Sequence, residues 1–348
     1  MSGKSVFLIG AGFIGREVLD RLLAENYSVT TLVRREAHAA ELQQSGAKTV
    51  LGTLEEKEII TTQAAAHDII FHTATADHVP SVEAVIAGIE ARAKQGKKTI
   101  YIHTSGTSLL GDDSKGEYKS DKIFYDDKPE DIDALPDTAA HREVDLAILR
   151  ASKRLGTAAK LAIMIPPLIY GFNPKYQRLS IQLPTLTRFA LKHKYAGYVG
   201  KGAAVWNQIH VYDLARGYMT LLHWLEQTDA QNVLHDPYFF CENGLEFSWG
   251  EAVAVIAKEL YKARRIESSE PKTIPENLYD DLFGDTTPWV VGSNARCRAN
   301  RLRALGWKPQ EKTLYESLVQ DEIPAILKED VANFHGYAGV AAVVGKSS

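Results

Sequence analysis

An apolar segment near the start of the chain runs directly into a glycine turn and then into an amphipathic segment. Residues 5–10 (SVFLIG) are rich in strand-forming side chains, and apolar residues recur at helical spacing from residue 16. Between them, Gly10, Gly12 and Gly15 form the pattern G-x-G-x-x-G. The first glycine permits a tight turn, the second leaves the backbone open to a phosphate group, and the third lets helix and strand pack closely. The alternative is a tight turn that holds no ligand. Because amides at the start of a helix attract phosphate oxygens, the sequence predicts a dinucleotide site that includes Gly10, Gly12, Phe13, Ile14 and Gly15.

The end of the second predicted strand, residues 28–33, carries two arginines. A site for NAD usually has Asp or Glu there, about 20 residues after the glycines. This chain has Arg34 and Arg35 instead. A guanidinium group can pair with the 2′-phosphate of NADP, whereas a carboxylate would repel it. The sequence therefore favours NADP(H) over NAD(H), with a solvated arginine pair as the alternative.

Short apolar runs alternate with amphipathic segments over the first 150 residues, which is typical of βαβ units and a parallel sheet. Further strands are expected at 48–52, 67–74, 97–105 and 161–171, and helices at 36–45, 81–95 and 140–156. The polar stretch 106–137 interrupts the alternation, and long loops of this kind are often functional. We expect an α/β fold with a doubly wound parallel sheet of the Rossmann type.

From residue 172 the alternation weakens, and Pro, Tyr and Trp become more frequent. We therefore expect a dinucleotide-binding domain over residues 1–171 and a smaller α/β substrate region over 172–330, interleaved with the sheet around 205–245. A loosely held tail is expected over 331–348. Ser248 and Glu251 form a capping-box pattern at the start of a predicted helix.

Composition excludes several classes of protein. The formal net charge of -4 provides no basic field for nucleic acid. Two cysteines, Cys241 and Cys297, are too few for a disulfide framework, and this favours a cytoplasmic location. Because they also lack metal-ligand spacing, no metal site is expected. No stretch approaches 18 consecutive apolar residues, so no membrane span is expected.

Several motifs together with the glycine turn resemble the extended short-chain dehydrogenase/reductases, especially the atypical NmrA-like and dihydroflavonol-reductase-like members. The motifs are IIFHTAT (69–75), IYIHTSGTSLLG (100–111), MIPPLIYG (164–171), NQIHVYDLARGYM (207–219) and SNARCRANRLRALGWKP (293–309). The resemblance extends to about residue 328. It implies further cofactor contacts from Thr53, Leu54, Ala74, Thr75, Ala76, Thr104, Pro166, Pro167 and Leu168.

The resemblance also implies a tyrosine that acts as acid and base, followed one turn later by a lysine that lowers the pKa of its phenol. At the matching positions this chain has His141 and Asp145. Residues at i and i+4 share a helix face, so Asp145 is expected to orient the imidazole and favour its protonated form. The alternative is a pair that only stabilises the first helical turn.

Two other groups are candidates for the same chemistry. Tyr118 and Lys122 form a literal Y-x-x-x-K pattern, although the surrounding residues lack the apolar period of a packed helix. Ser105 follows the fifth predicted strand, where the resemblance implies a hydroxyl that bonds the substrate. Its alternative role is to end the strand and begin the turn. The histidines at 72, 78 and 103 are expected to pack or hydrogen-bond rather than to bind metal.

The leading hypothesis is an NADPH-dependent reductase of a small carbonyl, imine or conjugated double bond, with Ser105, Asp145 and His141 or Tyr118 as catalytic candidates. One alternative is a non-catalytic, NmrA-like sensor of the cofactor's redox state that binds a regulatory protein. Another is an isomerase or epimerase that uses the cofactor transiently. Neither nucleic acid nor membrane is expected as a partner, and the resemblance is compatible with a homodimer that pairs through the helix beginning near His141.

Overall fold

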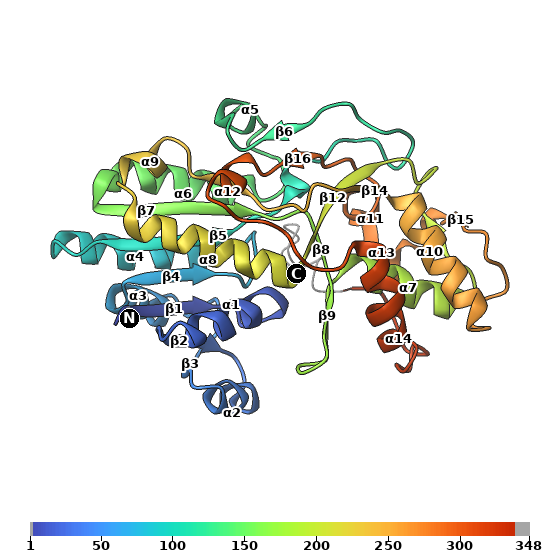
Figure 1. Cartoon of the computed structure of the whole chain (residues 1–348), viewed down its shortest axis with the longest axis horizontal. Helices are drawn as coiled ribbons and strands as arrows, with labels where there is room; N and C mark the ends of the chain where they lie inside the picture. Colours follow the sequence, from blue (N-terminus) through green and yellow to red (C-terminus); the bar gives the residue numbers. More distant parts are fainter. Residues whose placement is uncertain (1–2, 338–348) are drawn as a thin grey trace.

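A seven-stranded sheet forms one half of the computed structural model, on the left in Figure 1; the structure describes residues 3–337. The strand order is β13-β7-β5-β4-β1-β2-β3, and every neighbouring pair is parallel. The strands are β1 (Ser5–Ile9), β2 (Ser28–Val33), β3 (Lys48–Leu51), β4 (Ile69–His72), β5 (Thr99–Thr104), β7 (Ala159–Ile165) and β13 (Tyr238–Phe240). The predicted doubly wound parallel sheet is confirmed.

Helices cover both faces of this sheet because successive strand residues point to opposite sides. Phe7 and Tyr101 belong to the core under α3, α4 and α6, whereas Leu8 and Ile102 belong to the core under α1 and α8. The helices are α1 (Phe13–Ala24), α2 (Glu36–Gln44), α3 (Lys57–Ala66), α4 (Val79–Lys94), α6 (Arg142–Leu155) and α8 (Val211–Gln227). Both layers of a Rossmann unit are therefore present.

The predicted strand over 161–171 is wrong as a single element. The structure divides it into β7 in the large sheet and β8 (Leu168–Tyr170) in a second sheet, where β8 pairs with β12 (Val205–His210). Pro166 and Pro167 lie at the break, and neither has an amide hydrogen with which to continue a ladder. The break directs the chain from the first half of the molecule into the second.

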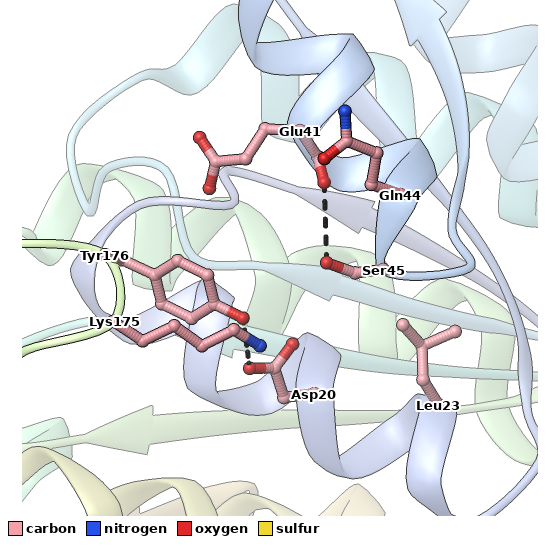
Figure 2. Close-up of a pocket in the computed structure, with 7 residues that line it drawn as sticks. All are labelled: Asp20, Leu23, Glu41, Gln44, Ser45, Lys175 and Tyr176. Atoms are coloured by element: carbon pink, nitrogen blue, oxygen red, sulfur yellow. Dashed lines mark hydrogen bonds between the residues drawn. The ribbon is translucent and has the colours of Figure 1, made fainter.

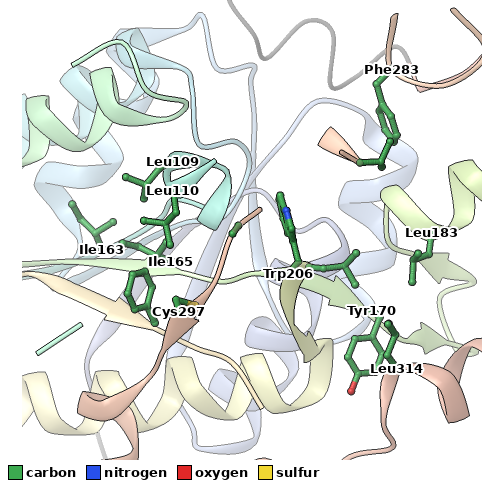
Figure 3. Packing of buried hydrophobic residues seen from close by; sticks show 14 of the residues in the cluster. Leu109, Leu110, Ile163, Ile165, Tyr170, Leu183, Trp206, Phe283, Cys297 and Leu314 are labelled. Atoms are coloured by element: carbon green, nitrogen blue, oxygen red, sulfur yellow. The ribbon is translucent and has the colours of Figure 1, made fainter. Parts of the chain in front are cut away.

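The second half contains the three-stranded sheet β14-β12-β8, with β14 (Glu246–Ser248), and the helices α7 (Gln182–His193) and α10 (Trp249–Lys262). The predicted capping box of Ser248 and Glu251 is confirmed. One buried cluster joins the halves, and Figure 3 shows Ile163 and Leu110 on one side with Trp206 and Leu183 toward the other.

The remaining strands and helices are short. They are β6 (Phe124–Tyr125), α5 (Pro129–Asp133), β9 (Phe172–Asn173), β10 (Arg178–Leu179), β11 (Gly197–Tyr198), α9 (Gln231–Leu234), β15 (Lys272–Thr273), α11 (Thr287–Val290), β16 (Cys297–Arg298), α12 (Asn300–Ala304), α13 (Leu314–Ser317) and α14 (Ile323–Ile326).

The hairpin of β9 and β10 connects the second half to the first. Its two strands pair antiparallel, and Tyr176 at its turn donates a hydrogen bond to Asp20 of α1 (2.8 Å). Asn173 donates to Glu17 of the same helix. The hairpin therefore packs on the helix that follows the glycine turn.

The predicted domain border at residue 171 stays a prediction. The seven-stranded sheet also includes β13, residues 238–240, from beyond that border.

Of the predicted tail over 331–348, residues 338–348 lie outside the described residues. The amide of Tyr337 donates to the carbonyl of Leu282 (2.7 Å). No helix of residues 3–337 is long and apolar enough to cross a bilayer. Those residues also contain no group of three or more His, Cys, Asp and Glu side chains arranged to hold a metal.

Candidate cofactor and catalytic site

The glycine turn joins β1 to α1, and each of its three glycines has a distinct steric role. Gly10 has a φ of 96°, and a β-carbon there would lie 2.4 Å from the Cα of Ala74. A β-carbon on Gly15 would lie 2.0 Å from the carbonyl oxygen of Gly10. At Gly12 a β-carbon would meet nothing within 4 Å. Gly10 and Gly15 thus permit close packing, and Gly12 leaves open space before the first helical amides.

This open space suits a diphosphate. Gly12 is the N-cap of α1 and offers no side chain that could bond the first amides, so those N–H groups can bind an anion. Phe13 and Ile14 contribute the first two of these amides. The residues present therefore fit the phosphates of a nicotinamide dinucleotide.

The other predicted cofactor residues follow the carboxyl ends of neighbouring strands, where ligands bind in sheets of this type. Arg34 and Arg35 follow β2, and both are exposed. Thr53 and Leu54 follow β3, and the Thr53 amide donates a hydrogen bond to the Glu56 carboxylate. The residues that follow β4 are Ala74, Thr75 and Ala76. Their contacts with a cofactor stay predictions.

Pro166 lies beside the end of β5, because its carbonyl accepts a hydrogen bond from the amide of Thr107 (3.0 Å). Pro167 and Leu168 continue from it into β8. Thr104, the last residue of β5, is buried and shares a 2.6 Å hydrogen bond with the hydroxyl of Tyr218. This bond holds the Thr104 side chain on the α8 side of the sheet, and a cofactor contact from Thr104 stays a prediction.

His141 is oriented by Asp77, which the sequence analysis missed. The imidazole Nδ1 donates to the Asp77 carboxylate at 2.6 Å, and both side chains are largely buried. A β-carbon on Gly106 would lie 3.2 Å from the other ring nitrogen, Nε2. The ring therefore has one nitrogen on a carboxylate and the other directed toward the turn that follows β5.

The predicted contact between His141 and Asp145 is wrong. Asp145 is buried and accepts a hydrogen bond from the hydroxyl of Ser105 at 3.0 Å. His141 precedes the first residue of α6. Its carbonyl accepts the helical hydrogen bond from the Asp145 amide (3.2 Å), but its left-handed φ of 66° gives its side chain a different direction from that of a residue within the helix. The structure thus contains two pairs, Asp77 with His141 and Asp145 with Ser105.

The electrostatics of the two pairs differ. Burial lowers the pKa of His141, but the hydrogen bond and charge of Asp77 and the charge of Asp145 outweigh burial and leave this pKa raised. Burial raises the pKa of Asp145 to about 7, although His141 and Ser105 act in the opposite direction. One Asp145 oxygen, Oδ1, is buried without a hydrogen-bond partner. The site therefore favours the protonated form of the His141 imidazole, beside an Asp145 carboxyl group that is partly neutral near pH 7.

Two more histidines lie under α4 and α6, in the interior of the protein. His72 bonds Ser81 (2.9 Å), His103 lies 3.1 Å from the Tyr101 hydroxyl, and the two rings are 5.2 Å apart. Burial lowers the pKa of His72 to about 3 and that of His103 well below its usual range. Both are neutral hydrogen-bonding histidines, as the sequence suggested. His78 caps α4 through the amide of Ser81.

The structure does not bring Tyr118 to this site. Tyr118 lies in an irregular segment with 51% of its surface exposed, and its carbonyl accepts a bond from Asn294. No helical turn joins it to Lys122, whose ammonium lies over the ring of Phe124. A catalytic Y-x-x-x-K pair needs both side chains on adjacent turns of one helix. Since Tyr118 and Lys122 do not lie on a helix, the hypothesis that they form such a pair is wrong.

Comparisons with known proteins agree with this geometry. A family model described as NAD(P)H-binding matches residues 10–152, from the glycine turn into α6. "Oxidase ucsJ" of Acremonium sp is 30% identical over 339 residues, which cover 90% of this chain and 95% of that protein. The chain belongs to the NAD(P)-binding Rossmann family of extended short-chain dehydrogenase/reductases.

Two further relatives of this extended dehydrogenase/reductase carry informative names. A "4-hydroxy-2-methyl-3-oxo-4-farnesyl-3,4-dihydroquinoline-1-oxide ketoreductase" of Stigmatella aurantiaca is 33% identical over 111 residues, covering 30% of this chain and 33% of that protein. The structure of yeast methylglyoxal/isovaleraldehyde reductase Gre2 with NADPH superimposes with a TM-score of 0.57. Its sequence identity is 16%, with 93% of this chain and 98% of that chain covered. At this identity the likeness shows the fold alone.

The buried Asp145 carboxyl group should make the thermal stability of the protein depend on pH. An Asp145→Asn variant should melt at the wild-type temperature at pH 4 but roughly 3–8 °C higher at pH 8. In the folded protein the carboxyl has a pKa near 7, well above its ordinary value, so wild-type stability falls as pH rises from about 4 to 7. Calorimetry across this range checks the difference, with exposed Asp137→Asn as the control. A pH-independent difference would contradict the assignment.

Proposed function

We propose that this protein is an NADPH-dependent reductase of a small organic carbonyl compound, with imines and conjugated double bonds as related substrates. The observation that carries the proposal is the orientation of His141. Asp77 holds the Nδ1 of His141, and its Nε2 is directed toward Gly106 beyond β5. By the resemblance, His141 matches the family's tyrosine. An imidazole held in this way is a suitable general acid.

The reduced nicotinamide, when bound, supplies the hydride. His141 then gives the Nε2 proton to the substrate oxygen, and the Asp77 carboxylate favours the protonated imidazole before that transfer. Ser105 is placed to bond the same oxygen. When Asp145 is neutral it can donate to the Ser105 oxygen, which frees the serine hydrogen for the substrate. In this proposal Asp77 and Asp145 are positioning residues.

Two of the similar proteins are named as reductases of carbonyl compounds, whereas the Acremonium relative is named an oxidase, which is the reverse direction of the same hydride transfer. The Stigmatella protein is a ketoreductase, and the yeast Gre2 structure is that of an aldehyde reductase with NADPH. The direct test is to follow the absorbance of NADPH with a panel of aldehydes, ketones, imines and enones. Turnover that disappears in a His141→Asn variant supports the proposal. NADPH binding without turnover across the panel would refute it and favour the cofactor-sensing regulator, in which the family's tyrosine and lysine are not required.

The preference for NADPH gives a separate prediction. An Arg34→Ala, Arg35→Ala double variant should raise the Kd of NADPH by about 10- to 100-fold and change that of NADH by less than about twofold. Both guanidinium groups are exposed at the end of β2, and no ion pair to either is recorded among residues 3–337. Calorimetric titration measures both constants. Lys94→Ala, an exposed charge at the far end of α4, is the matched control, and equal losses for both cofactors would contradict the prediction.

A further inference from the structure

Arg178 brings a third guanidinium group to the cofactor side of the sheet. It belongs to β10 of the hairpin, more than 160 positions beyond the glycine turn in sequence, yet its Nη1 donates to the carbonyl of Ala11 inside that turn (3.2 Å). Its Nη2 lies 3.2 Å from the Nε2 of His38, in the first turn of α2. Arg178 therefore lies between the glycine turn and the helix that begins just after Arg35.

The surroundings of Arg178 are rich in positive charge. Burial lowers the pKa of the His38 imidazole, and the charges of Arg178 and of Arg35, the N-cap of α2, lower it further, whereas the charge of Glu41 raises it. Among the described residues, no carboxylate lies within ion-pair distance of Arg178, although the chain forms many such pairs elsewhere. A guanidinium group that has no carboxylate partner is expected where an anion binds.

The hairpin holds Arg178 in place through contacts that do not involve the cofactor. Tyr176 bonds Asp20 (2.8 Å) and also accepts a hydrogen bond from the buried Arg16, whose guanidinium lies 3.9 Å over the Tyr176 ring. Figure 2 shows Tyr176 and Lys175 reaching across to Asp20, at a hollow also lined by Glu41 and Ser45. None of the residues lining this hollow belongs to the glycine turn, so it is the anchor of the hairpin and not the cofactor site.

We infer that Arg178 forms the 2′-phosphate site of NADP(H) together with Arg34 and Arg35, so that the hairpin from the second half of the chain helps to select the cofactor. The inference rests on the proposed preference for NADP(H) and adds a residue outside the nucleotide-binding segment. Ala11 fixes one edge of the guanidinium, and the other edge can pair with phosphate oxygens beside His38.

The test uses two nucleotides that differ only in the 2′-phosphate, adenosine 2′,5′-bisphosphate and 5′-AMP. Calorimetric titration of the full chain should show that Arg178→Gln raises the Kd of the bisphosphate about 10- to 50-fold and changes that of 5′-AMP by less than about twofold. Glutamine keeps an amide donor for the Ala11 carbonyl and removes the charge. Arg178→Met, which removes both, should show the same selectivity and provides a second measurement if one variant fails to fold.

Lys175→Met is the matched control, because it removes an exposed positive charge from the same hairpin away from the glycine turn. It should leave both dissociation constants unchanged. If the Arg178 variants lose affinity equally for both nucleotides, or lose none, the inference about Arg178 is overturned. If the Arg34, Arg35 double variant in the same experiment no longer distinguishes the bisphosphate from 5′-AMP, the proposed NADPH preference is retained. A wild-type protein that binds the two nucleotides equally would overturn both.

Discussion

A Gly12→Val variant should bind NADPH at least about 100-fold more weakly than the wild-type protein and melt at nearly the same temperature. Gly12 has a negative φ of -84°, and a β-carbon there meets no protein atom within 4 Å. The added side chain would occupy only the space before the first amides of α1. Titration with NADPH and a thermal melt without ligand measure the two effects separately.

Gly15→Ala is the informative comparison. A β-carbon at Gly15 would lie 2.0 Å from the Gly10 carbonyl and 2.4 Å from the hydroxyl of Thr73, so the melting temperature should fall by several degrees. Binding and stability are thus separated within one turn. If Gly12→Val binds NADPH normally, the diphosphate does not lie at this turn, and the cofactor assignment fails.

The second large effect concerns His141. A His141→Asn variant should lower kcat for carbonyl reduction by about 100-fold or more and leave the Kd of NADPH within about threefold. Asparagine tolerates the left-handed backbone found at this position, so the fold should be retained. Steady-state kinetics and cofactor titration provide the two measurements, and His235→Asn, at an exposed position, is the control.

The pH profile distinguishes an acid from a merely structural histidine. Because Asp77 raises the pKa of His141, wild-type kcat should decline only above the ordinary range for histidine, as the imidazole loses its proton. Asp77→Asn removes that stabilising charge, so the decline should move to lower pH. An unchanged profile in Asp77→Asn, or normal turnover in His141→Asn, would show that another group supplies the proton.

Local patterns predicted the parts of this protein that depend on neighbouring residues. Short sequence patterns indicated the glycine turn, the arginines after β2 and the alternation of strands and helices. The predicted strands and helices of the first 150 residues appear in the structure, with ends that differ by a few residues. The exception was the segment around Pro166 and Pro167, where the apolar run concealed a break. Two consecutive prolines were the available signal for it.

The arrangement of charged groups was harder to predict, because it depends on elements distant in the sequence. Asp77 contacts His141 across 64 positions, and its place just beyond the carboxyl end of β4 was the one available hint. The partner of Asp145 was missed because a helical rule was applied to His141, which lies outside the helix. Nothing in the sequence around Arg178 indicated that its hairpin reaches the glycine turn, since that contact depends on tertiary packing.

The edge strand β13 affects how the chain can fold during synthesis. Residues 238–240 pair with β7, so the central sheet lacks its outermost strand until residue 240 has been synthesised. A nascent chain that stops near residue 171 exposes the unpaired edge of β7, which is a template for aggregation. Completion of the nucleotide-binding layer therefore has to wait for a segment of the second half, and a fragment cut at the apparent border between the halves would need a substitute strand to remain monomeric.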